Sequence, residues 1–112
     1  MRIDELEIPG LMLIEPTKIG DARGFFSETF RADKFEAIAG PIRFVQDNQS
    51  LSARKGTLRG LHYQRAPRGQ AKLIRVTRGA IFDVAVDMRE GSATFGRHIA
   101  VELSERNWRQ LF

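Results

Sequence analysis

Short stretches in which apolar residues cluster or alternate with polar ones recur along the whole chain. This pattern predicts strands over residues 11–14, 24–30, 44–48, 56–64, 72–77, 81–87 and 98–103. Turn residues close several of these stretches, including Arg78-Gly79 and Glu90-Gly91-Ser92. Short strands at such intervals are typical of sandwiches and barrels, so the sequence predicts an all-β fold.

Two features depart from the repeated strand pattern. Residues 32–39 have the composition of a short helix, which Gly40-Pro41 ends. The chain closes on an apolar-rich run from Trp108 to Phe112, just after a turn that begins at Ser104. Such a run normally continues as a strand inside a sheet, because a sheet cut there would expose an unpaired edge. We therefore expect residues 1–112 to form a single domain that is truncated at its C-terminus.

The composition is that of a globular protein. Of the 112 residues, 42% are apolar and 29% are charged, and this length suits one domain. The absence of cysteine excludes disulfides and thiolate metal ligands. The acidic N-terminus is unlike a signal peptide, and no apolar run is long enough for a membrane helix. We expect a soluble cytoplasmic protein that does not associate with membranes.

The formal net charge of +4 favours anionic partners such as phosphates, nucleotides or nucleic acid. The basic residues are scattered, however, and only Arg54, Lys55 and Arg59 are loosely grouped. Charge alone does not choose among these partners.

The segment from Gly56 to Gln64 carries the most informative chemistry. It places His62 close to Arg59, and Lys72 follows a few residues later. A neutral imidazole is the commonest general base near neutral pH, because its unperturbed pKa is about 6.5. A nearby cation can stabilise an oxyanion or bind a phosphate. By itself the combination is weak, because a single histidine in a strand is more often structural.

A wider set of motifs resembles the dTDP-4-dehydrorhamnose 3,5-epimerase family, in family order and at close to family spacing. The matching segments are Asp21–Glu28, Phe44–Asn48, Leu58–Gln64, Lys72–Val76, Ile81–Asp87, Gly91–Gly96 and Val101–Ser104. The resemblance implies a cupin-type jelly roll and a nucleotide-sugar epimerase that acts on dTDP-4-dehydro-6-deoxyglucose. The product would serve dTDP-L-rhamnose and cell-surface polysaccharide biosynthesis.

The resemblance also implies roles for individual residues. His62 matches the base that removes protons at C3 and C5, and Lys72 matches the cation near the C4 ketone oxygen. The residues that match substrate-binding positions are Arg23, Glu28, Gln46, Asn48 and Arg59. Epimerisation returns the same oxidation state, so no redox cofactor is expected. Complete members form homodimers by exchanging N-terminal strands, and we expect the same here.

The family's general acid is a tyrosine on a later strand. Tyr63 is the sole tyrosine of this chain and does not match that position. We therefore expect the 112 residues alone to lack the proton donor.

A metal site is not expected. Metal-binding cupins present two histidines one residue apart and then a glutamate, whereas this chain has His62 and Gln64 followed by Arg65. His98 lies in a different predicted strand.

Strand alternation leaves two questions open. Asp83 shares a strand face with Asp87, so its carboxylate either orients His62 or lies on a solvated face. Alternation also puts Arg59 and His62 on opposite faces, so either a bulge at Gly60 brings them together or one assignment is wrong.

Two other functions stay in view. One is an inert cupin module that binds nucleotide sugars through Arg23, Arg59 and Lys72 without turnover. The other is a basic β-module for nucleic acid, which the scattered cations do not favour.

Overall fold

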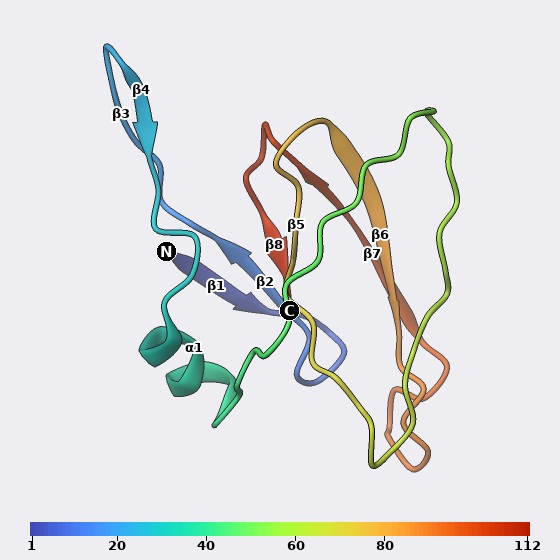
Figure 1. Ribbon diagram of the computed structural model, residues 1–112. Helices are drawn as coiled ribbons and strands as arrows, with labels where there is room; N and C mark the ends of the chain where they lie inside the picture. The colour runs from blue at the N-terminus through green and yellow to red at the C-terminus, as the bar shows by residue number, and fades with distance from the viewer.

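The computed structural model describes all 112 residues and consists of short strands with one helix (Figure 1). The elements are β1 (Arg2–Glu5), β2 (Met12–Glu15), β3 (Ile19–Asp21), β4 (Gly24–Phe26), α1 (Ala32–Ala39), β5 (Ile74–Arg75), β6 (Ala80–Val86), β7 (His98–Ser104) and β8 (Gln110–Leu111). The predicted helix and the predicted strands at β2, β6 and β7 are confirmed. Strands β1 and β3 were not predicted.

One sheet joins the two ends of the chain in the order β1-β2-β8-β5. Strand β8 pairs antiparallel with β2, through Leu13 and Leu111, and with β5, through Ile74 and Leu111. The prediction that the apolar C-terminal run enters a sheet is therefore confirmed. Its two flanking neighbours satisfy its backbone groups, which explains why Gln110 and Leu111 are both buried.

Strands β6 and β7 form a separate two-stranded sheet of seven residue pairs. Because paired residues project to the same side, Ile81, Asp83 and Ala85 share one face with Leu103, Val101 and Ile99. Leu103 is completely buried, so this face is the inner one. The opposite face carries Phe82, which is 75% exposed.

Strands β3 and β4 form a hairpin that projects away from the rest of the molecule (Figure 1). All six of its strand residues are exposed, including Phe26. We call residues 19–26 the arm.

Helix α1 contacts the C-terminal end of the chain through one aromatic cluster. Phe35 is 3% exposed, and its ring centroid lies 4.9 Å from that of Phe30 and 5.9 Å from that of Phe112. Gly40, with φ at +74°, ends the helix, and its N–H donates to the carbonyl of Glu36.

Four strand predictions fail wholly or in part. Residues 44–48 and 56–64 have no regular secondary structure, and the strand predicted over 72–77 is reduced to β5. A strand needs a hydrogen-bonded neighbour, and in this chain residues 44–48 and 56–64 have none, while residues 72–77 pair with β8 at Ile74 and Arg75 alone. The strand predicted over 24–30 likewise shortens to β4, because its sole partner is the short β3.

The chain packs loosely for its length. Its radius of gyration is 15.1 Å, whereas a compact domain of this size has about 13 Å. Every residue from 45 to 72 is exposed, including Leu58 and Leu61. The single short helix is no candidate for crossing a membrane.

Candidate functional site

The predicted site residues lie on separate parts of the chain. Arg23 is at the tip of the arm, and Glu28 lies between β4 and α1. Asp83 is on β6. The others lie in the exposed segment that precedes β5: Gln46, Asn48, Arg59, His62 and Lys72. One hydrogen bond joins two members of the set, from Gln46 Nε2 to Asn48 Oδ1 at 3.3 Å.

The backbone at Gly60 decides how His62 relates to Arg59. Gly60 has φ at +111°, a region that favours glycine, and a Cβ there would lie 3.4 Å from the imidazole Cδ2 of His62. Strand alternation therefore does not run through Gly60. Of the two alternatives left open by the sequence, a bulge at Gly60 does not form, because no partner strand pairs with this segment.

Arg59 is held against the preceding loop. Its Nε donates to the Ser52 hydroxyl at 3.1 Å, and one terminal nitrogen donates to the carbonyl of Leu51 at 3.3 Å. These contacts fix the guanidinium within the same exposed segment that carries His62.

The charges near the arm are paired locally. Arg23 contacts the Asp21 carboxylate at 2.6 Å, and this hydrogen bond lowers the pKa of Asp21 and raises that of Arg23. Glu28 accepts a hydrogen bond of 2.6 Å from Lys34, which lowers the pKa of Glu28. Both carboxyl groups are therefore anionic at neutral pH, and a ligand of Arg23 must compete with Asp21.

Asp83 is in an unusual environment for a carboxylate. It shares the inner face of the β6–β7 sheet with Ile81 and Leu103. Its Oδ2 is buried without a hydrogen-bond partner, and burial raises the pKa of this carboxyl. The interpretation of Asp83 as part of a solvated face is therefore wrong. Its role in orienting His62 stays a prediction, because Asp83 Oδ2 makes no hydrogen bond to His62 in this structure.

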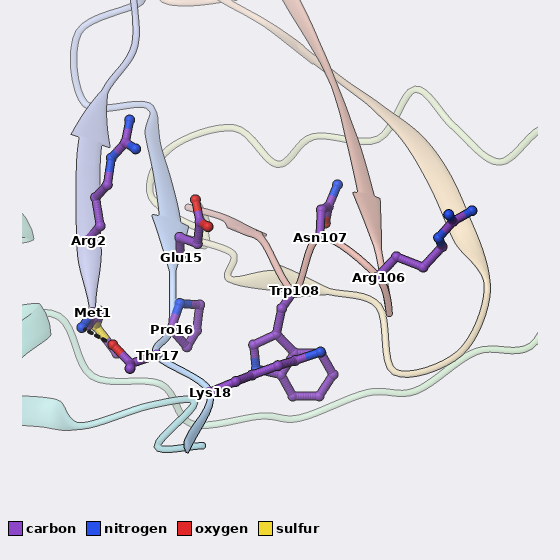
Figure 2. A pocket seen from close by; sticks show the side chains of 9 residues that line it. All are labelled: Met1, Arg2, Glu15, Pro16, Thr17, Lys18, Arg106, Asn107 and Trp108. Carbon is purple, nitrogen blue, oxygen red and sulfur yellow. Dashed lines mark hydrogen bonds between the residues drawn. The ribbon is translucent and has the colours of Figure 1, made fainter. Parts of the chain in front are cut away.

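Sequence reasoning did not select the residues around Trp108. A surface hollow of about 490 Å³ is lined by Lys18 and Trp108 together with Arg2 and Arg106 (Figure 2). None of the predicted site residues lines it. Aromatic residues beside turns are common in sheet proteins, so the sequence carried no signal that Trp108 and Lys18 would line a surface hollow together. No group of three or more His, Asp or Glu side chains is placed to hold a metal ion.

The family model, the similar sequences and the similar structures all point to one protein family. Residues 5–112 match the family model described as dTDP-4-dehydrorhamnose 3,5-epimerase. The chain is 52% identical over 112 residues to the dTDP-4-dehydrorhamnose 3,5-epimerase of Sinorhizobium fredii. That match covers 100% of this chain and 57% of the relative, so this chain spans little more than half the relative's length.

Two solved structures have nearly the same fold. The dTDP-4-dehydrorhamnose 3,5-epimerase of Bacillus anthracis, with TDP and PPi bound, has a TM-score of 0.94 and 45% identity over 98% of this chain and 63% of its own. The dTDP-6-deoxy-D-glucose-3,5-epimerase of Legionella pneumophila, in complex with dTDP-4-keto-L-rhamnose, has a TM-score of 0.91 and 51% identity. It matches over 98% of this chain and 58% of its own.

These likenesses confirm the predicted all-β, cupin-type jelly roll with one short helix. The family match covers nearly all of the sequence and agrees with the motifs around Arg23, His62 and Asp83. The chain belongs to the dTDP-4-dehydrorhamnose 3,5-epimerase family.

Proposed function

We propose that this protein epimerises a dTDP-linked 4-keto-6-deoxyhexose at C3 and C5, as a step of dTDP-L-rhamnose biosynthesis. The observation that carries the proposal is the identity of about half of all positions, over the whole chain, with an epimerase of this name. The Bacillus anthracis and Legionella pneumophila neighbours hold TDP and a dTDP-linked keto-sugar, which supports a ligand of the same class here.

In the proposed reaction His62 is the base. The protons at C3 and C5 are acidic because each lies beside the C4 ketone, and removal of either leaves an enolate. Lys72 would lie near the ketone oxygen, where a cation offsets the developing negative charge. Reprotonation from the opposite face then inverts the carbon. Neither step changes the oxidation state, so the proposal includes no redox cofactor and no metal.

The remaining residues would bind the nucleotide. The planar fork of Arg59 suits a diphosphate oxygen, and Arg23 adds a second cation. Glu28, Gln46 and Asn48 offer acceptors and donors for the base and sugar.

We also propose a homodimer in which the arms are exchanged. The arm projects from the molecule and exposes Phe26 and Ile19, at 69% and 65%. Burial of such side chains against a second copy would be favourable. In that arrangement Arg23 of one subunit would reach the site of the other.

The test measures incorporation of solvent deuterium into the keto-sugar. A chain of family length can be made by joining residues 1–112 to the remaining C-terminal part of the Sinorhizobium fredii relative. We expect His62→Ala to lower the exchange rate about 10²–10⁴-fold, the usual contribution of a general base. Tyr63→Phe is the control, because Tyr63 has no proposed role. Exchange at the parental rate in the His62→Ala protein would refute the assignment.

A second candidate is an inert module that binds nucleotide sugars. It is favoured by the exposure of the His62 and Lys72 side chains in this structure. Binding of thymidine diphosphate by the joined chain, without deuterium exchange at any carbon, would support this function over the first.

A further inference from the structure

Four side chains form a cluster at the root of the arm, which we call the Trp108 clamp: Lys18, Phe25, Ser27 and Trp108. The indole Nε1 of Trp108 donates to the Ser27 hydroxyl at 3.0 Å. The rings of Phe25 and Trp108 meet edge to face, with centroids 5.1 Å apart. Lys18 Nζ lies 4.5 Å and 4.3 Å from these two centroids, and its side chain crosses the indole (Figure 2). These are favourable aromatic and cation–π geometries.

A second set of contacts extends the attachment. Gln110, which is 2% exposed, donates from Nε2 to the carbonyl of Thr29 at 2.9 Å. Arg75 donates to the Thr29 hydroxyl at 2.7 Å. Every second residue from Phe25 to Thr29 therefore contacts a residue in or next to β8: Phe25 and Ser27 contact Trp108, and Thr29 contacts Gln110. Glu28 turns away from these contacts and instead pairs with Lys34.

The turn that presents Trp108 is itself constrained. Trp108 has φ at +59°, an unfavourable conformation for a residue with a side chain, and its N–H donates to the carbonyl of Ser104 at 2.9 Å. The side-chain oxygen of Asn107 accepts hydrogen bonds from the backbone N–H groups of Ser104 and Arg109, at 3.0 Å and 3.1 Å. The surrounding contacts therefore hold the indole in one place.

The arm depends on this anchor for its direction. Its two strands pair with each other and with no other strand, and all of their residues are exposed. Lys18 and Phe25 are at the two sides of its root, and Lys18 also donates to the carbonyl of Glu105 at 3.3 Å. Asp21 holds the Arg23 guanidinium within the arm, so the guanidinium moves with the arm. Without the Trp108 clamp, the direction of the arm depends on the more distant contacts of Thr29 with Gln110 and Arg75.

We propose that Trp108 is a positioning residue for nucleotide binding: the Trp108 clamp sets the direction of the arm and so the place of Arg23, without touching the ligand. The inference rests on the proposed function, which gives Arg23 to the nucleotide. It assigns a role to Trp108, Ser27 and Lys18, none of which contributes to the proposed chemistry.

The test combines two measurements on the joined chain described above. The first is the affinity for thymidine diphosphate by calorimetry, for Trp108→Leu, Ser27→Ala and Arg23→Ala. We expect Trp108→Leu to weaken binding about tenfold, the size expected when Arg23 loses one charge-assisted hydrogen bond to the diphosphate. We expect no further loss when it is combined with Arg23→Ala. Phe95→Leu is the control, because Phe95 is as exposed as Phe25, at 53%, and lies outside the clamp.

The second measurement is amide hydrogen exchange at residues 24–27. We expect faster exchange in Trp108→Leu and in the milder Lys18→Met, and parental exchange in Phe95→Leu. Parental exchange in both clamp variants would overturn the proposal, whatever the affinities. Parental affinity in Trp108→Leu, with weakened binding in Arg23→Ala, would also overturn it. If neither the parent nor Arg23→Ala responds to the nucleotide, the proposed function fails, and the exchange rates alone decide the role of the clamp.

Discussion

The carboxylate of Asp87 accepts a hydrogen bond of 2.6 Å from the hydroxyl of Thr94, seven residues later in the loop between β6 and β7. The same carboxylate accepts from the Ser92 hydroxyl at 2.7 Å and from Arg89 Nε at 2.8 Å. The backbone N–H of Gly96 donates to the Asp87 carbonyl at 2.7 Å. One side chain therefore organises the loop that closes this hairpin.

We predict that Asp87→Asn lowers the melting temperature at pH 7. The hydrogen bonds from Arg89, Thr94 and Ser92 hold the pKa of Asp87 far below its usual range. A carboxyl whose pKa is lowered by folding stabilises the protein above its unfolded pKa of about 3.9, and this contribution is lost as the pH falls. Thermal unfolding from pH 7 to pH 3 should therefore show a difference between parent and variant that shrinks with acidification. A constant difference would contradict the assignment.

We predict the opposite sign for Asp83→Asn. Burial raises the pKa of Asp83, so its charged form costs stability once the pH rises above the unfolded pKa. The neutral variant should have a higher melting temperature than the parent at pH 7 and little difference at pH 3. Glu102→Gln on the neighbouring strand is the control, because Glu102 is exposed. A lower melting temperature at pH 7 would mean that the carboxylate has a stabilising partner.

We predict that a substitution on the inner face of the β6–β7 sheet destabilises the chain more than one on the outer face. Leu103 is 0% exposed, so Leu103→Ala should destabilise the chain by about 2–5 kcal/mol, the usual cost of removing a buried leucine side chain. Phe82→Ala on the opposite face is the matched control, because Phe82 is 75% exposed and little burial is lost. Urea unfolding of the three proteins measures both changes. Equal effects would mean that the assignment of inner and outer faces is wrong.

The 112-residue chain should turn over no dTDP-4-keto sugar by itself. The resemblance implies a tyrosine donor at a position that Tyr63 does not match, and Tyr63 is the one tyrosine present. Product analysis by NMR, with the joined chain as the positive control, measures this. Epimerised product from the 112 residues at a rate near that of the joined chain would refute the prediction.

Most of the elements that the sequence predicted correctly have local or hairpin-like support, and β8, which pairs with the distant β2 and β5, is the exception. Helix α1 depends on its own hydrogen bonds and on Gly40, and β6 and β7 alternate over seven residues and pair with each other. The family was also readable, because ordered motifs around Arg23 and His62 are properties of the sequence itself. The strands predicted over 44–48, 56–64 and 72–77 have no pairing partner in the neighbouring sequence, whereas the strand over 24–30 is limited by the short β3.

The sequence by itself therefore determined the all-β class, the helix, the family and the residue types that the proposed chemistry needs. Tertiary structure alone decided that Asp83 lies on the inner, apolar face, that Gly60 breaks the alternation between Arg59 and His62, and that Trp108 contacts Ser27. Each of these depends on which segments distant in sequence become neighbours. Periodicity assigns a side chain to one of two faces, but only the packed sheets decide which face is buried.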